Sequence, residues 1–563
     1  MEYKIFNTEL VQEEQTLFLK IFGQVTSETS ERIRVVAVFD GESERRRILC
    51  QTEQVYDEDT GREMFVAQSR VQLPFVFYGD GPVGQVSLYF ELQNSYETVV
   101  VEESHMLDAG NFERQQGKKR LGFRVYRWFS FFVYTLLLPM SLLDGYFALR
   151  GEKELDTGEN TNRTGKKAIF FHANAITKRM SGYSYSPREW KTAYFRRCYE
   201  KYQKLPVEKD RVLFLSERKA EENSNLLCVY RKFAEQKHLH VELSVNPTTV
   251  DKLSMKEIRR TARQLAVSRM VILEDFYPQL HVLKIRKETE VVQLWHACGA
   301  FKTFGFSRMG KKGGPSQSSP NHRSYDWVFV SGEQIAPIYA EAFAIPDDHV
   351  RALGVPRTDL LFQEDYKQAK RAELFSKYPG WTGKKIILFA PTFRGDGNRD
   401  AYYPEERFSV EAYMKELPED VVLLVKHHPF VKQPVSIPEQ WRERVFDMSR
   451  EESMNDLLLV TDLLITDYSS SIFEAAILQV PMLFYVFDRE EYLGTRDVYY
   501  DFAQFVPGVL AENLQELSEA TKACLEGDSR YAERHSRFCQ AYLDALDGHS
   551  TERIGDFLLE RMA

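Results

Sequence analysis

From residue 166 onwards the chain alternates short apolar runs with helical stretches, and this alternation restricts the fold more than any other feature of the sequence. The apolar runs cover 166–174, 211–217, 240–245, 270–275 and 291–297, and then 327–332, 385–393, 421–429, 462–470 and 481–488. Because strand–helix–strand repeats build parallel sheets, we predict an α/β protein with two Rossmann-type lobes, 166–365 and 366–563. From about Ala511 the chain is expected to be helical and to pack around the second lobe.

The first 105 residues have a different pattern. Short stretches that are β-branched or aromatic and partly alternating cover 16–25, 32–40, 64–73, 85–93 and 97–103. This spacing predicts a small all-β sandwich over residues 1–105. The region contains no cluster of catalytic residue types, so a binding or structural role is favoured over catalysis.

Residues 106–165 join these parts and include an unusual basic and apolar segment. Its basic residues are Arg114, Lys118, Lys119, Arg120, Arg124 and Arg127. The next sixteen residues, 128–143, carry no charge, and they include Pro139, which would kink a helix. Sixteen residues are fewer than the roughly 20 that a membrane-spanning helix needs. We therefore predict a helix in the membrane interface, with a buried interdomain helix as the alternative.

Charge and cysteine content narrow the class of protein. The 74 Lys and Arg residues against 83 Asp and Glu residues give a net charge of −9, which argues against a nucleic-acid binder. The six cysteines form no CxxC pair, which fits a reducing cytoplasm. The first 15 residues lack the basic and apolar pattern of a signal peptide, so we expect a cytoplasmic protein.

Polar residues follow several of the predicted strands, where ligands of open α/β sheets bind. The first group is His296, at the end of the run 291–297, with Lys302 shortly after it. The others, in the second lobe, are Thr392 and Arg394, then Lys426 and His428, and then Asp467, Ser469 and Ser470. Four such groups together indicate one ligand site between the lobes.

At these residues the sequence resembles the CDP-glycerol glycerophosphotransferases, the teichoic-acid polymerases and primases of Gram-positive bacteria. The motifs that carry the resemblance are WHACGAFKTFGF (295–306), GVPRTD (354–359), APTFRGDG (390–397), KHHP (426–429), ITDYSSSIFEAA (465–476) and FDREEYLGTRDVYYD (487–501). The resemblance covers about 166–560 and implies a GT-B-like fold. It also implies transfer of a polyol phosphate from a CDP-activated donor to a growing chain, with release of CMP.

Two histidines are the candidate catalytic residues. His296 is the candidate base for the acceptor hydroxyl, because imidazole gains and loses a proton near neutral pH. The family motif there is nearer W-H-G-T-P than the W-H-A-C-G of this chain, so the acceptor loop differs. The resemblance selects His428, rather than its neighbour His427, as the group that stabilises the phosphoryl oxygens or the departing CMP.

The donor is expected to bind in the second lobe. Asp467, Ser469 and Ser470 precede a predicted helix, whose N-terminus suits a pyrophosphate, although an ordinary serine N-cap is the alternative. The resemblance makes Glu474 a candidate ribose contact. Further donor-side candidates are Thr392, Arg394, Lys426 and Arg496; Arg394 and Lys426 are either phosphate partners or surface charges.

The acceptor side is expected near a basic, glycine-rich loop, 307–323. Lys302, Arg308, Lys311 and Lys312 would attract a phosphate polymer, and the alternative is an ordinary solvated loop. The sequence shows no metal-ligand constellation, so we expect a reaction without a metal or other cofactor.

These observations predict an enzyme of wall or capsule polymer synthesis. The expected partners are CDP-glycerol or CDP-ribitol, a lipid-linked anionic polymer acceptor and an anionic membrane surface, without nucleic acid. The expected location is the cytoplasm, peripherally attached to the inner face of the cell membrane. Two alternatives stay open: a GT-B glycosyltransferase that uses a nucleotide sugar, and a non-catalytic polymer-binding protein.

Overall fold

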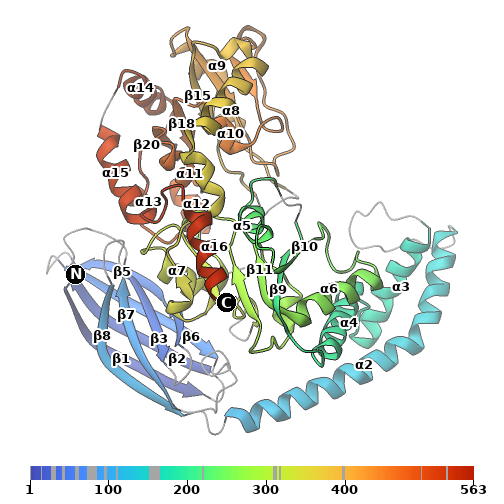
Figure 1. The fold of residues 1–563 in the computed structure, drawn as a ribbon. Coiled ribbons are helices and arrows are strands. Elements are labelled where there is room, and N and C mark those ends of the chain that lie inside the picture. The colour runs from blue at the N-terminus through green and yellow to red at the C-terminus, as the bar shows by residue number, and fades with distance from the viewer. Residues whose placement is uncertain are drawn as a thin grey trace.

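The computed structural model divides the chain into a β domain, a long helix with its neighbours, and two α/β lobes (Figure 1). It describes residues 2–13, 16–26, 33–40, 45–57, 62–72, 85–93, 98–108, 112–150, 165–218, 221–308, 314–315, 319–395, 400–495, 498–527 and 530–562. Lys311, Lys312 and Arg496 lie outside these residues, so their predicted roles stay predictions.

The N-terminal domain is the expected all-β sandwich. One antiparallel sheet has the order β1-β2-β6-β5, and the other has the order β4-β3-β7-β8. The strands are β1 (Glu2–Glu13), β2 (Thr16–Thr26), β3 (Arg34–Asp40), β4 (Arg45–Leu49), β5 (Gln51–Asp57), β6 (Arg62–Gln72), β7 (Gln85–Gln93) and β8 (Thr98–Asp108). Alternation places Leu17, Leu19 and Ile21 inside the sandwich and exposes Phe18 and Phe22.

The sandwich packs against the first lobe. Phe306, from the WHACGAFKTFGF motif, and Ala344, which follows α7 (Ala336–Phe343), belong to the same buried cluster as the sandwich core. Because this cluster is apolar and shared, the β domain is attached to the lobe that carries His296.

The first lobe contains a six-stranded parallel sheet with the order β10-β9-β11-β12-β13-β14. Its strands are β9 (Glu208–Ser216), β10 (His240–Val245), β11 (Ser268–Leu273), β12 (Glu290–Gln293), β13 (Trp327–Phe329) and β14 (Val350–Arg351). Its helices include α4 (Pro187–Tyr202), α5 (Asn225–Ala234) and α6 (Met255–Val267). The buried parts of β9 and β11, residues 212–216 and 270–273, are nearly continuous apolar runs, as a sheet covered on both faces requires.

The second lobe repeats this arrangement. Its parallel sheet has the order β17-β16-β15-β18-β19-β20. The strands are β15 (Lys385–Phe389), β16 (Val421–Val425), β17 (Val445–Asp447), β18 (Leu463–Thr466), β19 (Met482–Tyr485) and β20 (Val509–Ala511). The helices are α8 (Glu364–Lys377), α9 (Val410–Lys415), α10 (Met454–Leu458), α11 (Ile472–Ile477), α12 (Arg489–Thr495), α13 (Phe502–Phe505), α14 (Leu514–Leu525) and α15 (Arg530–Tyr542).

The last helix, α16 (Ser550–Glu560), returns to the first lobe (Figure 1). Ile554 and Leu558 are buried in the cluster that contains β9 and β11 side chains. Asp359, of the GVPRTD motif, accepts hydrogen bonds from the backbone N–H groups of Ser550 and Thr551, at 2.9 and 2.7 Å. The expectation that the whole C-terminal region packs around the second lobe is therefore wrong for α16.

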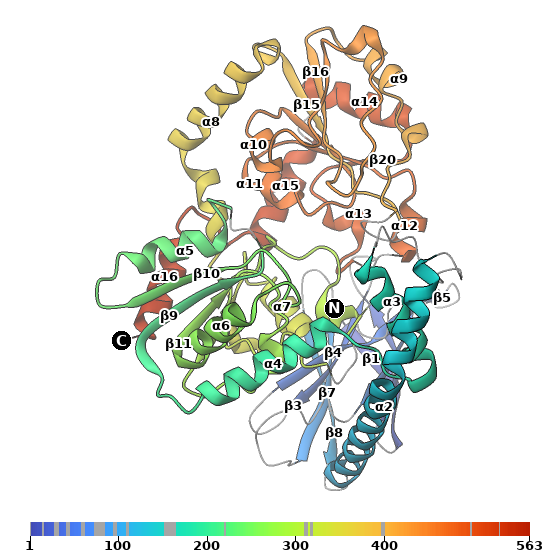
Figure 2. The ribbon, with the colours of Figure 1, turned by 90° about the vertical axis from the view of Figure 1, so that its right-hand side faces the viewer.

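The segment 166–174, predicted as a strand, is part of a helix instead. Helix α3 (Lys166–Ser181) runs antiparallel to α2 (Phe112–Leu149), and the two lie side by side (Figure 2). The buried residues Ala168, His172 and Ala173 recur at helical spacing on one face of α3. His172 Nε2 lies 3.2 Å from Asp144 Oδ2, and the hydroxyl of Tyr134 donates to Asn174 Oδ1 at 3.0 Å. Packing against α2 therefore decides the conformation of this apolar run.

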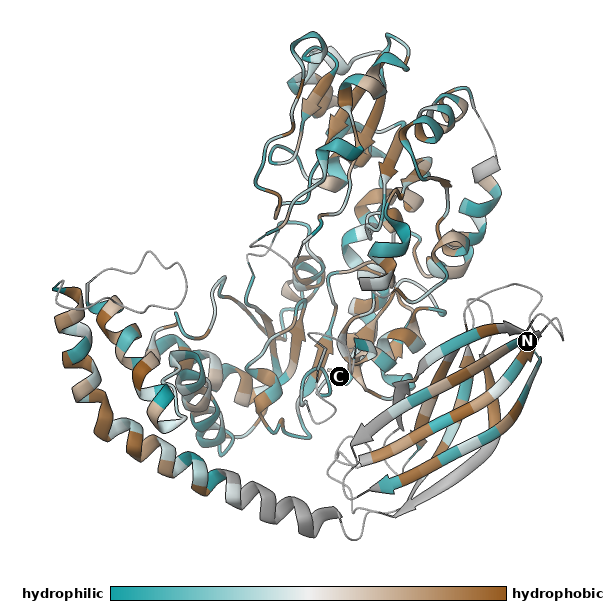
Figure 3. Cartoon of the chain, turned by 180° about the vertical axis from the view of Figure 1, so that it is seen from behind, coloured by the Kyte–Doolittle hydropathy of each residue, from teal (hydrophilic) through white to brown (hydrophobic). Residues whose placement is uncertain are grey.

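Helix α2 includes the predicted basic and apolar segment, and Pro139 lies inside it. The face away from α3 exposes large apolar side chains: Trp128 is 76% exposed, Leu136 61% and Met140 70%. The hydropathy colouring marks apolar residues along the described part of the helix (Figure 3). A buried interdomain helix, the alternative from the sequence, is therefore wrong for this face. By length and composition alone, Arg124–Leu149 would suffice to cross a membrane.

Candidate functional site

The loop after β12 presents His296 from a strained backbone. Trp295 adopts φ 53°, which is unfavourable for a bulky residue. Its N–H donates to Gln293 Oε1 at 2.8 Å, and its carbonyl accepts from Asn225 Nδ2 at 2.6 Å. The side chains of Gln293 and Asn225 therefore hold the turn that carries His296.

Aromatic side chains support Trp295 from behind. The Trp295 ring lies 5.1 Å from Phe343 and 5.8 Å from His322, between ring centroids. The hydroxyl of Tyr325 lies between His281 Nε2, at 3.3 Å, and His322 Nδ1, at 3.2 Å. Burial lowers the pKa of both histidines to about 3, so they are neutral at physiological pH. This neutral, packed cluster of side chains supports the His296 loop.

His296 pairs with a carboxylate that follows the neighbouring strand. Its Nδ1 lies 2.9 Å from Asp275 Oδ1, and the His296 side chain is 44% exposed while that of Asp275 is 9% exposed. Arg218 Nη1 lies 3.3 Å from the same oxygen. The carboxylate lies beside Nδ1, so Nε2 is the candidate nitrogen for chemistry. Asp275 was not predicted as a site residue, although it ends an apolar run, MVILED, as His296 does.

Arg357, from the GVPRTD motif, joins the His296 loop to the second lobe. Its Nε donates to the carbonyl of His296 at 3.2 Å, and its Nη2 forms an ion pair with Glu474 of α11. Its own N–H donates to Asn225 Oδ1 at 2.7 Å. Burial disfavours the charged guanidinium, but the attraction of Glu474 outweighs it and raises the pKa of Arg357. A ribose contact of Glu474 stays a prediction, and the described partner of its carboxylate is Arg357.

The two lobes also meet at Gly299. This residue has φ 70°, and a Cβ there would lie 2.4 Å from the ring of Phe473 in α11. Only glycine combines this backbone conformation with so close an approach. The loop after His296 is therefore packed directly against α11, the helix that follows the three serines of the ITDYSSSIFEAA motif.

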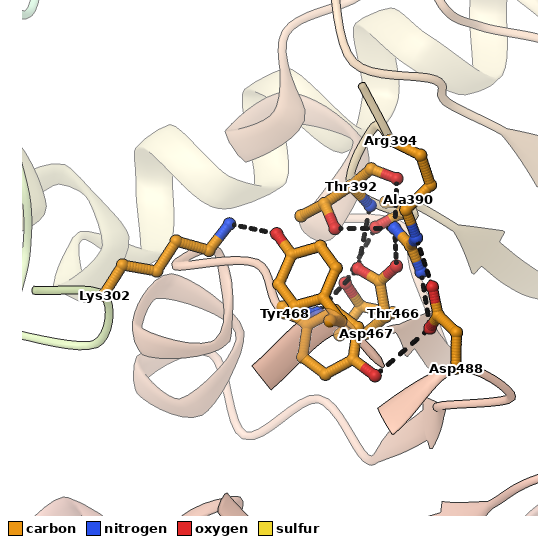
Figure 4. A network of polar contacts seen from close by, with 9 residues as sticks. Lys302, Ala390, Thr392, Arg394, Thr466, Asp467, Tyr468 and Asp488 are labelled. Carbon is orange, nitrogen blue, oxygen red and sulfur yellow. Dashed lines mark hydrogen bonds and ion pairs between the residues drawn. The ribbon is translucent and has the colours of Figure 1, made fainter. Parts of the chain in front are cut away.

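In the second lobe, Arg394 ties three strand-end loops together (Figure 4). Its guanidinium donates to Asp488 at 2.6 and 3.0 Å, to Asp467 Oδ2 at 3.0 Å and to the carbonyl of Thr392 at 2.9 Å. Asp467 Oδ1 accepts from the N–H groups of Thr392 and Tyr468, at 2.8 and 2.6 Å. Burial opposes the charge of Arg394, but Asp467 and Asp488 raise its pKa.

This network excludes a surface charge as the role of Arg394, since the side chain is buried and its bonds go to protein groups. Phosphate binding by Arg394, Thr392 and Asp467 stays a prediction. Asp488 was not predicted, although it ends the apolar run 481–488 as the other site residues end theirs.

Lys302 makes a second contact between the lobes. Its Nζ donates to the hydroxyl of Tyr492 at 2.9 Å, and the Tyr492 ring stacks on Tyr468 with centroids 3.8 Å apart. Lys302 also forms a backbone bridge with Val498, which lies in the tail motif. The predicted acceptor role of Lys302 is untested, and so is that of Arg308, which ends a short 3₁₀ helix, Gly305–Arg308.

The two adjacent histidines after β16 have different environments. His427 is buried, and burial lowers its pKa. His428 is half-buried between Phe393 and Phe430, with ring centroids 4.8 and 4.7 Å away. Its Nδ1 accepts from the N–H of Phe430 at 3.2 Å, so a neutral ring carries its proton on Nε2 and can donate it. The geometry favours His428 over His427 as a donor to an anion.

Lys426 and the serines show positioning contacts. Lys426 Nζ donates to the carbonyls of Met448 and Glu452 at 3.0 and 2.5 Å, and burial lowers its pKa. Ser469 Oγ accepts from the N–H of Ser471 at 3.2 Å, next to the first turn of the six-residue α11, while Ser470 is exposed. Phosphate binding by Lys426, Ser469 and Ser470 stays a prediction.

Across the described ranges, no group of three or more His, Cys, Asp or Glu side chains is arranged to hold a metal ion. A reaction without a metal or cofactor therefore stays a prediction.

The residues just described lie in a region that matches one family. The model of the CDP-Glycerol:Poly(glycerophosphate) glycerophosphotransferase family matches residues 194–560, which is most of the chain. The chain therefore belongs to this family, and the resemblance seen in the sequence is confirmed.

Comparisons with curated relatives and with solved structures agree with this family assignment. The chain is 38% identical over 405 residues to the teichoic acid poly(ribitol-phosphate) polymerase of Bacillus spizizenii, covering 72% of this chain and 61% of the relative. It is 40% identical to the teichoic acid ribitol-phosphate polymerase TarK of Staphylococcus aureus, over 62% of this chain and 68% of the relative. The structure of the wall teichoic acid polymerase TagF aligns with a TM-score of 0.54 at 18% identity, covering 67% of this chain and 98% of that chain. The expected two-lobed fold is confirmed.

The Arg357–Glu474 pair can be tested by a double-mutant cycle. Arg357→Met leaves the Glu474 carboxylate buried without its partner, so we expect the free energy of unfolding to fall by about 3–5 kcal/mol. Adding Glu474→Gln removes the uncompensated charge, and part of this loss should be recovered. Denaturant unfolding measures both values.

The exposed Arg442, 67% accessible in its side chain, gives a matched control. Arg442→Met should change stability by no more than about 0.5 kcal/mol. Additive effects of the Arg357 and Glu474 changes would contradict the described pairing.

Proposed function

We propose that this chain transfers ribitol phosphate or glycerol phosphate from a CDP-activated polyol to the end of a growing teichoic-acid-type polymer, releasing CMP. The observation that carries the proposal is the His296–Asp275 pair, held by Arg357 against α11 of the second lobe. Family membership supports the reaction class. One solved structure of TagF was soaked with CDPG, which supports a CDP-linked donor.

In the proposed reaction the acceptor hydroxyl oxygen attacks the β-phosphorus of the CDP-polyol. As the new P–O bond forms, the bond between this phosphorus and the bridging oxygen breaks, and the electron pair leaves with CMP. His296 Nε2 takes the hydroxyl proton, while Asp275 stabilises the resulting imidazolium. His428 Nε2–H donates to the charge that develops on the phosphoryl oxygens.

The choice of polyol is open to a direct test. Two ribitol-phosphate polymerases among the relatives are 38% and 40% identical over 405 and 357 residues, while a glycerol-phosphate primase of Bacillus spizizenii is 36% identical over a shorter stretch of 248 residues. We therefore take CDP-ribitol as the preferred donor and CDP-glycerol as the second. A GT-B glycosyltransferase would instead consume a nucleotide sugar.

Replacing His296 tests the proposed base. With a purified polymer acceptor, His296→Ala should lower CMP release from the preferred CDP-polyol by roughly 10²–10⁴-fold, since one general base typically contributes this much. His549→Ala is the control, because the His549 side chain is 67% exposed on α16's N-terminal side. Unchanged CMP release by His296→Ala at saturating donor would refute the role of the base.

The same assay separates the reaction classes. Wild-type protein should release CMP from CDP-ribitol or CDP-glycerol and leave UDP-N-acetylglucosamine intact. Turnover of the sugar nucleotide alone would replace the proposal by the glycosyltransferase alternative, and no turnover of any donor would favour a polymer-binding role.

We further propose that the protein attaches peripherally to the inner face of the cell membrane through α2. The support is the exposed apolar face of α2, from Trp128 to Leu143. Helix α3 carries Lys166, Lys167, Lys178 and Arg179 and packs along α2, so α2 is not free to be surrounded by lipid. Such a pair fits the interface between headgroups and acyl chains better than the hydrocarbon core.

Polar substitutions on α2 test this attachment. Trp128→Ser, Phe129→Ser and Phe132→Ser together should reduce sedimentation with phosphatidylcholine vesicles by about tenfold or more, because apolar burial drives interfacial binding. Phe6→Ser, Phe18→Ser and Phe22→Ser, on the exposed face of the β domain, provide the control. Equal sedimentation of both triple variants and wild type would contradict attachment through α2.

A further inference from the structure

A cavity between α2 and α4 takes no part in the proposed reaction. It has a volume of about 450 Å³, and its described lining includes Arg127 of α2 and Arg188, Glu189, Thr192 and Arg196 of α4. Three arginines and one glutamate therefore line one concave surface. Guanidinium groups bind phosphate oxygens through paired N–H donors, so this surface has the chemistry of a phosphate site.

The carboxylates near these arginines are weak competitors. Arg127 Nη2 donates to Glu189 Oε2 at 3.2 Å, and both side chains are more than half exposed. Arg196 lies 3.7 Å from Glu200, one helical turn away, and this pair is also exposed. Exposed ion pairs of this kind contribute little to stability, so an incoming phosphate can replace them. Arg188 interacts electrostatically with Asp251 and Glu217, which lie outside the described lining of the cavity.

The cavity lies beside the start of the exposed apolar face of α2. Arg127 is the last charged residue before the uncharged stretch that begins with Trp128, which is 76% exposed. On α4, Trp190 is 49% exposed and stacks on Tyr194. Exposed tryptophans next to arginines are typical of the level at which headgroups meet acyl chains. If the apolar face of α2 enters the acyl region, the three arginines lie at the depth of the lipid phosphates.

We propose that this cavity binds the phosphate of an anionic lipid headgroup. The proposal rests on the attachment through α2 and adds a specific contact to it. The arginines select an anionic lipid, while the apolar face of α2 supplies affinity that is independent of lipid charge. The bound headgroup fixes α2, and through α3 and α4 the first lobe, relative to the membrane surface.

Dihexanoyl phosphatidylglycerol, used as monomers below its micelle concentration, tests the cavity without a membrane. Arg188→Gln with Arg196→Gln should weaken its binding to the full-length chain by at least about tenfold in calorimetric titration, because charge-assisted hydrogen bonds to phosphate are lost. Thr192→Glu, which adds a carboxylate to the lining, should weaken binding to a similar extent. The control is Arg442→Gln with Arg537→Gln, two exposed arginines that are also paired with glutamates on their own helical turns.

Each outcome of this experiment supports or overturns the proposal. Loss of binding in both cavity variants, with the control unchanged, supports it. Binding by the cavity variants equal to that of the control overturns it. Inorganic phosphate that binds as tightly as the lipid, with the same arginine dependence, identifies a site for free phosphate and overturns the headgroup assignment. Lipid binding that persists when wild-type protein fails to sediment with vesicles would refute attachment through α2 and leave the cavity assignment standing.

Discussion

The guanidinium of Arg357 makes the contacts on which the arrangement of the site depends. It bonds the carbonyl of His296 in the first lobe and the carboxylate of Glu474 in the second. A buried charge needs a partner, so neither lobe can move away without leaving Arg357 or Glu474 uncompensated. The Arg357 side chain therefore connects the loop of the candidate base, His296, to helix α11.

The polar residues at the strand ends divide into cations that position loops and histidines that are proposed to act on substrates. Arg394 and Lys426 make their described bonds to carboxylates and backbone carbonyls, which fixes the loops of the second lobe. His296 and His428 are instead contacted at Nδ1, the first by Asp275 and the second by the N–H of Phe430. The described contacts support loop positioning by Arg394 and Lys426, while the roles of the two histidines in the reaction stay proposals.

The parallel sheets could be predicted from the sequence because fully buried strands such as β16 and β19 are continuous apolar runs. Segment 166–174 was mistaken for a strand, since a short apolar run fits either conformation and only its contact with α2 decides. Strands β1 and β4 were missed because their sequences, EYKIFNTELVQE and RRRIL, are too polar to form apolar runs.

The candidate site was predicted in part for a similar reason. Strand ends identified His296, Arg394 and Asp467, whose contacts form within or between adjacent loops. The rule extends to Asp275 and Asp488, which also end apolar runs. Arg357 could not be found in this way, because it follows no strand of the expected pattern and its partner Glu474 lies 117 residues further along the chain.

Amide hydrogen exchange of the Glu474→Gln variant tests the coupling by Arg357 most directly. The substitution lies in α11 of the second lobe, and the exposed Glu443→Gln serves as its control. If Arg357 links the lobes, exchange should accelerate both in 472–477 and in the His296 loop, 294–301, with the first-lobe strands unchanged. Faster exchange confined to 472–477 would contradict the account.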